Sequence, residues 1–203
     1  MKLIASLTSP YARKIRIVLA ERHQPFELVV DIPWNADTHV PDYNPLGKVP
    51  ALVADDGSVY VDSPVIAEYI DGVLRSPLLI PAERAQAVKV KLIEALADGL
   101  IDAAVAVFLE RKRTPDRQDA EWIARQLGKI DLALASLARQ LGGGTWFHEQ
   151  HLTLADIAVG CALGYLAFRF AEIGWRNQHP ALAAFYDRLM TRESFLASAP
   201  PHA

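Results

Sequence analysis

Two serine–proline pairs in this chain have the residue types that hold small anions at the starts of helices. Ser9 precedes Pro10, and Ser63 precedes Pro64. Serine is a preferred helix N-cap, and proline fits the first helical position, where its missing N–H costs nothing. The start of a helix presents free N–H donors and a partial positive charge. If the fold brings both starts to one cleft, the pairs predict a small-molecule enzyme or binder whose ligand carries several negative charges.

The hydroxyl of Ser9 has a possible chemical role beyond capping a helix, which is to donate a hydrogen bond to a thiolate of the ligand. A free thiol has a pKa of about 8.5, and lowering it by about two units requires about 2.7 kcal/mol of preferential thiolate stabilisation. One hydroxyl donor to a charged acceptor supplies about 1.5–3 kcal/mol, and the helix start adds about 0.3–1 kcal/mol. The two together suffice, and the nucleophile is then the sulfur of the ligand.

Two further features lie between and beside the serine–proline pairs. The dipeptide Val49-Pro50 is either a plain strand entry or, if its peptide bond is cis, a place where the Val49 backbone pairs with an extended peptide-like ligand. Asp62 directly precedes Ser63. This is either a strand end followed by a cap, or a site for a zwitterion whose ammonium binds Asp62 and whose carboxylate binds the hydroxyl and N–H of Ser63.

The first third of the chain predicts a small α/β domain that would position these residues. Apolar patterns indicate strands at 2–7 and 26–30 with a helix at 10–22 between them. The segments 51–54 and 59–61 flank Asp-Asp-Gly-Ser and predict a hairpin, and a helix capped by Ser63 follows. The order β-α-β then β-β-α is the thioredoxin-like arrangement, in which helices cover four strands.

The remainder of the chain predicts only helices. A proline-containing segment at 75–81 indicates a linker, and a helix with apolar spacing follows at 84–113. Thr114-Pro115 predicts the start of a helix that ends at residue 141, before three glycines. Further helices are expected from Thr153 and from residue 180. We therefore expect a thioredoxin-like domain over 1–76 and an all-α domain over 84–203.

Composition limits the classes of function. The chain has 203 residues, 51% hydrophobic and 22% charged, with a formal net charge of −3 and no long basic run, which argues against nucleic acid as a partner. Charges interrupt every apolar run, so we expect no membrane span and a cytoplasmic protein. The single cysteine, Cys161, is expected to be an inert core thiol, and the histidines show no spacing typical of metal ligands. The basic residues Arg13, Lys14 and Arg16 are expected to form a solvated helix face.

Four motifs in order along the chain resemble those of the cytosolic glutathione transferases. They are Ser-Pro-Tyr-Ala-Arg-Lys at 9–14, Asn-Pro-Leu-Gly-Lys-Val-Pro at 44–50, Asp-Ser-Pro-Val-Ile-Ala-Glu-Tyr-Ile at 62–70 and Thr-Leu-Ala-Asp-Ile-Ala at 153–158. The resemblance spans nearly the whole chain and is strongest to small bacterial members with serine at the active position. The resemblance implies a glutathione-binding domain, a helical domain that takes the electrophile, and a homodimer. Glutathione is then a substrate, and neither a metal nor another cofactor is required.

The same resemblance implies roles for individual residues. Ser9 would activate the glutathione sulfur, Val49 beside Pro50 would pair with the cysteinyl backbone, and Asp62 with Ser63 would hold the γ-glutamyl end. Lys48 and His39 are candidates for the glycyl carboxylate, and Asp156 is expected to be structural. The remaining candidates are assigned to the second-substrate pocket: Tyr11, Phe108, Arg111 and Tyr165.

Some alternatives stay open at this point. Tyr11 also carries a hydroxyl and is the alternative to Ser9 as the donor to the sulfur. Family members often have Glu or Gln where Asp62 stands, and the shorter aspartate has less reach toward the γ-glutamyl end. Serine cannot form a mixed disulfide, which disfavours thiol exchange. The rival functions are a non-catalytic binding or regulatory protein of this fold, and a glutathione-dependent isomerase or peroxidase.

Overall fold

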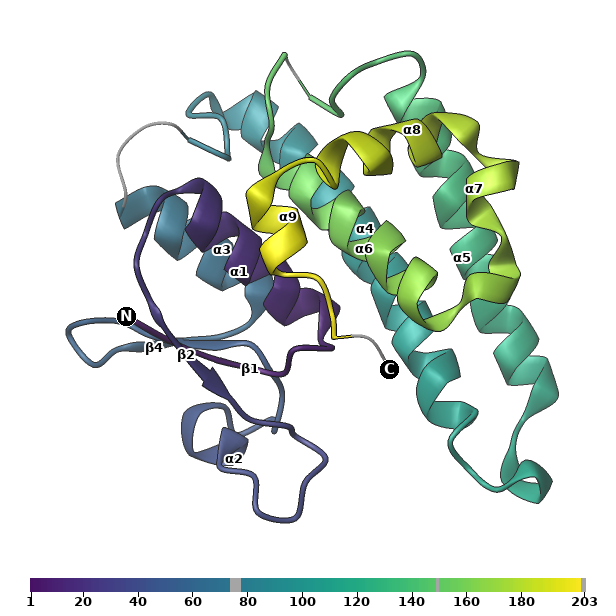
Figure 1. The fold of residues 1–203 in the computed structure, drawn as a ribbon, viewed down its shortest axis with the longest axis horizontal. Helices are drawn as coiled ribbons and strands as arrows, with labels where there is room; N and C mark the ends of the chain where they lie inside the picture. Colours follow the sequence, from purple (N-terminus) through teal and green to yellow (C-terminus); the bar gives the residue numbers. More distant parts are fainter. Residues whose placement is uncertain (74–77, 149, 202–203) are drawn as a thin grey trace. The chain divides into compact units, whose positions relative to one another are not determined.

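The computed structural model describes residues 1–73, 78–148 and 150–201 (Figure 1). Contacts within the chain divide it into two compact units. The first unit comprises Met1–Ala82 together with the segment from Met190 onward, and the second comprises Glu83–Leu189. The segment from Met190 onward, which the sequence had placed in the helical domain, therefore groups with the first unit. The linker expected at 75–81 lies partly outside the described residues.

The first unit is built on a four-stranded mixed sheet with the order β2-β1-β3-β4. Its elements are β1 (Lys2–Ala5), α1 (Pro10–Glu21), β2 (Glu27–Val30), the single turn α2 (Val40–Tyr43), β3 (Ala51–Val53), β4 (Val59–Tyr60) and α3 (Ser63–Val73). Strand β1 pairs with β2 in parallel and with β3 antiparallel, and β3 pairs antiparallel with β4. Helices α1 and α3 pack against each other (Figure 1). The predicted β-α-β and β-β-α order is confirmed.

The two serines occupy different positions relative to their helices, because α1 begins one residue after Ser9 whereas α3 begins at Ser63 itself. Ser9 is the N-cap of α1, and its Oγ accepts a bond of 3.2 Å from the N–H of Ala12. Helix α3 already begins at Ser63, because the N–H of Ile66 donates to the carbonyl of Asp62 at 2.9 Å. The N-cap is the residue whose carbonyl accepts the first helical bond. Asp62 therefore takes the position that the sequence had assigned to Ser63.

A short helix near the end of the described chain, α9 (Glu193–Ala197), covers part of α1. Arg13 donates to the carbonyl of Phe195 at 3.1 Å, and Arg16 donates to that of Ala197 at 3.0 Å. Arg13 and Lys14 are almost completely buried. The expectation of a solvated basic face on α1 is therefore wrong, because α9 supplies backbone carbonyls that satisfy the guanidinium groups.

The second unit is helical throughout its described secondary structure, as predicted. Its helices are α4 (Arg84–Glu110), α5 (Ala120–Leu141), α6 (Leu154–Arg169), α7 (Trp175–Gln178) and α8 (Pro180–Leu189), with short 3-10 turns η1 (Pro115–Arg117) and η2 (Ala171–Ile173). Helix α4 packs against both α5 and α6. Every residue of α6 from Leu154 to Leu166 is buried, so α6 is the central helix of this unit.

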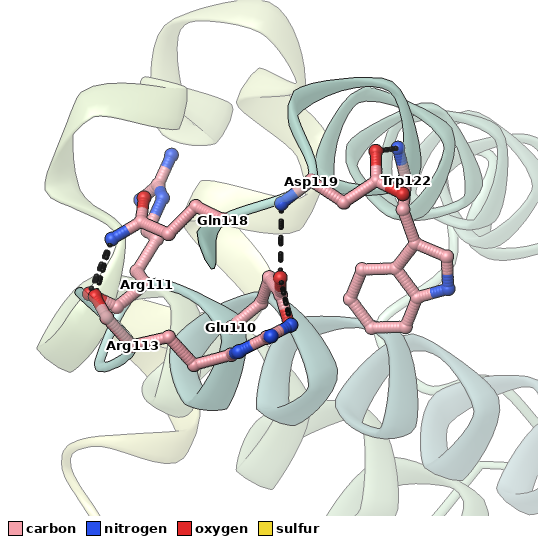
Figure 2. Close-up of polar contacts among 6 residues, drawn as sticks. All are labelled: Glu110, Arg111, Arg113, Gln118, Asp119 and Trp122. Carbon is pink, nitrogen blue, oxygen red and sulfur yellow. Dashed lines mark hydrogen bonds and ion pairs between the residues drawn. The ribbon is translucent and has the colours of Figure 1, made fainter. Parts of the chain in front are cut away.

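The turn between α4 and α5 corrects a predicted helix start (Figure 2). Thr114 and Pro115 open only the 3-10 turn, and α5 begins at Ala120. Asp119 caps α5 by accepting from the N–H of Trp122 at 3.0 Å. The carboxylate of Glu110 accepts from the N–H of Asp119 at 2.9 Å, and this bond fixes the cap. The Asp119 carboxylate thus satisfies a free N–H at the start of α5, whereas the side chain of Thr114 makes no cap bond.

Within the described residues, no single helix is long and apolar enough to cross a membrane. Helix α6 and the segment Ala171–Gln178 reach that length and apolar character only together, and they are bent by 100° where they meet. The apolar character of α6 is accounted for by its burial inside the second unit.

Candidate functional site

The register of the sheet brings three strand ends to one edge. Ile4, near the end of β1, pairs with Ala51 at the beginning of β3. Leu52 of β3 pairs with Tyr60 at the end of β4. Because both pairings are antiparallel, the end of β1, the start of β3 and the end of β4 all lie at the same edge of the sheet.

The candidate residues are attached to that edge. Ser9 follows β1 and starts α1, Val49 and Pro50 lead directly into β3, and Asp62 with Ser63 connect β4 to α3. The sequence had required both helix starts to reach one cleft, and the topology of the first unit places both at one edge of the sheet. This edge therefore offers two helix starts, a strand entry and one carboxylate to a common ligand.

The hydroxyl of Ser9 can still donate a hydrogen bond. Its N–H donates to the carbonyl of Ser6 at 3.1 Å, and its Oγ accepts from Ala12. A hydroxyl that accepts one bond can still donate its own proton. Within the described residues, no acceptor for the Ser9 hydroxyl proton is found. The half-buried Ser9 can therefore donate to a ligand while it caps α1.

The strand entry before β3 has a free backbone. The Val49-Pro50 peptide bond is cis, the form that the peptide-binding interpretation requires. In the part of the chain that the structure describes, the backbone hydrogen bonds outside helices and strands do not involve Val49. Pro50 is buried, and Val49 packs on a cluster that includes Ile4 and Ala51. The Val49 amide and carbonyl therefore remain open to an extended ligand.

Asn44 shapes the loop that leads to this entry, and sequence reasoning gave it no role. Its side chain is buried, with an exposed fraction of 2%. Its amide donates to the carbonyl of Lys48 at 2.9 Å, and its oxygen accepts from the N–H of Leu46 at 3.0 Å. An asparagine that bonds backbone two residues ahead is typical of a turn, and the Asn-Pro-x-Gly pattern carried that signal.

Asp62 and Ser63, the pair predicted to bind a zwitterion, differ in exposure. Ser63 is 2% exposed, and among the described residues its hydroxyl has no hydrogen-bond partner. Asp62 is exposed, and its carboxylate likewise has no partner there. The Ser63 hydroxyl and the Asp62 carboxylate are therefore both available to a ligand. The pair offers a donor and an acceptor side by side at the start of α3.

The two candidates for the glycyl carboxylate differ in their surroundings. Lys48 is exposed, and no ion pair with it is found within the described residues. His39 is exposed, and its Nδ1 lies 3.4 Å from Oδ2 of Asp42. The backbone N–H of His39 donates to the carboxylate of Asp31. The pKa of Asp31 is lowered chiefly by the hydrogen bond from the Thr38 hydroxyl. Nearby acids surround His39 but not Lys48, so Lys48 is the better candidate for an anion.

The second-substrate candidates have distinct environments within their own units. Tyr11 is half-buried in the first turn of α1. Arg111 makes a 2.6 Å ion pair with Glu172, and its guanidinium lies over the ring of Phe170. Tyr165 is 7% exposed, and burial raises the pKa of its phenol. Arg111 and Tyr165 are therefore engaged within the helical unit.

Phe108, by contrast, is half-buried and lies beside two cations that sequence reasoning missed, Lys112 and Arg169. Helical spacing could have indicated Lys112, which follows Phe108 by four residues in the helix predicted at 84–113, but not Arg169, which ends a different helix, α6.

Asp156 lies at the start of α6 and is fully buried. Its carboxylate accepts from the N–H of Phe147 at 2.8 Å, from the N–H of Thr153 at 2.8 Å and from the hydroxyl of Thr153 at 2.9 Å. Burial raises the pKa of Asp156, and these bonds oppose that rise. The carboxylate joins the preceding loop to the helix, which is a structural arrangement.

The single cysteine of the chain lies in the second unit. Cys161 is buried in α6, as expected. Among the described residues, no group of three or more His, Cys, Asp and Glu side chains could hold a metal ion.

Comparison with known proteins finds similar domains in both units. Residues 8–73 match the N-terminal domain of glutathione S-transferase, and residues 120–188 match its C-terminal domain. The uncharacterized GST-like protein YibF of Escherichia coli is 41% identical over 203 residues, covering 100% of both chains. A maleylacetoacetate isomerase of Pseudomonas aeruginosa is 28% identical over 84% of this chain and 82% of its own.

Among solved structures, a glutathione S-transferase of Methylobacterium radiotolerans in complex with glutathione sulfonate superposes with a TM-score of 0.95. It is 43% identical, and the match covers 100% of this chain and 95% of that one.

Proposed function

The chain belongs to the glutathione S-transferase family, and we propose that it is a glutathione transferase in which Ser9 stabilises the glutathione thiolate. The observation that carries this proposal is the shared sheet edge, where Ser9, the Val49 backbone and the Asp62-Ser63 pair all lie. A peptide-like thiol with a zwitterionic end needs these three groups together. The complex of the related transferase with glutathione sulfonate supports the choice of ligand.

In the proposed binding mode, each part of glutathione has its own group. The free N–H and C=O of Val49 pair with the cysteinyl backbone, as in the addition of a strand to a sheet. The Asp62 carboxylate takes the γ-glutamyl ammonium, and the Ser63 hydroxyl takes its carboxylate. Lys48, and less favourably His39, meets the glycyl carboxylate. The glutathione sulfur then comes to the start of α1.

The proposed reaction needs little chemistry from the protein. Ser9 donates a hydrogen bond to the sulfur, the thiol proton leaves to solvent, and the thiolate attacks an electrophilic carbon. A sulfur–carbon bond forms while the leaving group departs with its electron pair. The protein contributes orientation and a lowered thiol pKa. A glutathione-dependent isomerase would use the same thiolate, and the 28% identical isomerase keeps that activity as the second candidate.

We also propose a homodimer. On α4, Val88 and Leu92 are 61% and 64% exposed and lie one turn apart on the same side of the helix. Ala95 and Gly99 continue that stripe and are exposed. An exposed apolar stripe of this kind favours burial against a second copy of the chain.

The test of the enzymatic proposal is the pH profile of Ser9→Ala with glutathione and 1-chloro-2,4-dinitrobenzene. In the native protein we expect kcat/KM to follow an apparent thiol pKa of about 6.5, two units below that of a free thiol. Removal of one donor to a charged acceptor should raise this pKa by about one to two units. Ser9→Thr keeps both the hydroxyl and the cap, and it should retain the native profile.

The variant Tyr11→Phe tests whether the hydroxyl of Tyr11, rather than that of Ser9, donates to the glutathione sulfur. An unchanged profile in Ser9→Ala, with the shift seen in Tyr11→Phe instead, would refute the role of Ser9. Retention on immobilised glutathione without turnover of any electrophile would refute the enzymatic proposal and indicate a binding protein. Product analysis with maleylacetoacetate distinguishes isomerisation from conjugation.

A further inference from the structure

Arg13 links the first turn of α1 to residues 190–198 of the same unit, the segment that contains α9 (Figure 1). Its backbone N–H donates to the carbonyl of Ser9 at 2.9 Å, which is the first hydrogen bond of the helix. Its guanidinium donates to the carbonyl of Phe195 at 3.1 Å and to the hydroxyl oxygen of Ser198 at 3.4 Å. One residue therefore bonds both the cap of α1 and a segment far along the chain.

The side chain of Arg13 is held firmly in this position. Arg13 is 4% exposed, and its Cζ lies 5.9 Å from the centroid of the fully buried Phe195 ring. Its guanidinium also donates to the sulfur of Met190 at 3.7 Å. A buried guanidinium loses these bonds if it moves, and bonds from a charged donor are the costly ones to lose. The 190–198 segment therefore fixes the first turn of α1.

Two other side chains of α1 hold the same segment, but further from the cap. Arg16 donates to two backbone carbonyls of the segment at 3.0 and 3.3 Å. Glu21 ends α1 and accepts from Arg192 at 2.8 and 2.7 Å. A helix rises about 1.5 Å per residue, so Glu21 lies about 18 Å along α1 from Ser9. Of the three, Arg13 is the one whose backbone donates to Ser9.

The stability of the unit explains part of this arrangement. A buried guanidinium needs acceptors, and the 190–198 segment supplies them. This explanation requires only that the segment be held in place, and Arg16 does that as well as Arg13. It therefore predicts the same consequence for Ser9 when either arginine is lost, whereas a positioning role predicts a consequence for Arg13 alone.

We propose that Arg13 is a positioning residue through which the 190–198 segment holds the Ser9 hydroxyl in the orientation that meets the glutathione sulfur. This inference rests on the proposed function of Ser9. The bond from the N–H of Ala12 to the Ser9 oxygen limits where the hydroxyl proton can point, and it lies in the turn that Arg13 anchors. A hydrogen bond weakens as its angle departs from linear, so a small rotation of this turn weakens donation to a thiolate. Arg13 itself does not touch the ligand.

The first test titrates glutathione bound to the protein by following the ultraviolet absorbance of its thiolate against pH, with no electrophile present. Arg13→Met should raise the thiol pKa by about 0.5–1 unit, because the Ser9 hydroxyl then donates less well. Arg13→Lys keeps one charged donor for the Phe195 carbonyl and should give a smaller rise. Arg16→Met is the matched control, since it also loses bonds to the 190–198 segment. It should shift the pKa by less than about 0.2 unit.

The second test measures amide hydrogen exchange in the free protein by nuclear magnetic resonance. In Arg13→Met the N–H of Ala12, which donates to the Ser9 oxygen, should exchange at least about 10-fold faster than in the native protein. In Arg16→Met the same N–H should change by less than about 3-fold. Equal changes in the two variants, in exchange or in the titration, would overturn the proposal and indicate a general anchoring of the segment.

Together the tests separate this inference from the proposed function. If Ser9→Ala raises the thiol pKa and Arg13→Met does not, the role of Ser9 stands and the positioning role is refuted. If Arg13→Met raises the pKa but the native protein conjugates no electrophile, the transferase function fails and the positioning role stands. If the native protein binds no glutathione, the proposed function fails, and the exchange of the Ala12 N–H alone decides whether Arg13 positions the cap.

Discussion

Asp156→Ala should destabilise the helical unit severely. The native carboxylate accepts bonds from the N–H groups of Phe147 and Thr153 and from the Thr153 hydroxyl. The hydroxyl can turn to another acceptor, but the two N–H groups cannot. A buried N–H left without a partner costs about 1–3 kcal/mol, so alanine should cost about 2–6 kcal/mol. A domain is stable by only about 5–15 kcal/mol, so this loss is a large share.

Asparagine at the same position gives an intermediate result that tests the mechanism. Its single oxygen can accept from one of the two N–H groups, so Asp156→Asn should cost about 1–3 kcal/mol. The assay is urea unfolding followed by far-UV circular dichroism, which reports the helical unit. Asp131→Asn, on the exposed face of α5, is the control and should change stability by less than about 0.5 kcal/mol. A loss below about 1 kcal/mol in Asp156→Ala would refute the reasoning.

Two further predictions concern the first unit. Glu21→Gln should cost about 1–2 kcal/mol at pH 7, because Glu21 accepts from Arg192 and Ser194. Burial raises the pKa of Glu21, but these bonds outweigh burial, so the pKa of Glu21 is lowered in the folded protein. The extra stability of the native protein over Glu21→Gln is therefore present above about pH 4.5 and disappears as the pH falls through the folded pKa. Unfolding of both proteins at pH 7 and pH 3 checks this, and a stability difference that persists at pH 3 would contradict it. Asn44→Ala should weaken glutathione binding by about 3- to 10-fold in calorimetry, because the turn before Val49 loses both side-chain bonds, whereas equal affinities would show that this turn does not position the strand entry.

The sequence predicted the first unit well because its signals are local. A cap serine with proline, an Asp-Asp-Gly-Ser turn and short apolar runs each specify one element within a few residues. Once the strand order is that of a thioredoxin-like domain, the residues that follow β1 and β4 and those that precede β3 necessarily meet at one edge. The candidate residues of the first unit could therefore be proposed together before the structure was seen.

The features that were missed depend on contacts between distant parts of the chain. Arg13 donates to a carbonyl of α9, which lies about 180 residues further along the sequence. The true start of α5 depends on Glu110 reaching the N–H of Asp119, across a turn whose own residues favoured an earlier start. No short-range pattern encodes either contact, so sequence reasoning assigned each segment its commonest local behaviour.

The two serine–proline pairs are chemically different because of a one-residue difference in where each helix begins. In α1 the Ser9 oxygen accepts from the backbone, so only its proton is available, and a donor suits a thiolate. In α3 the N-cap position belongs to Asp62, so the Ser63 hydroxyl is not engaged by its own helix and stays available to a carboxylate. The Asp62 carboxylate at the same cap is acceptor-only and suits an ammonium. The difference in helix start thus supports assigning the sulfur to Ser9 and the zwitterionic end to Asp62 and Ser63.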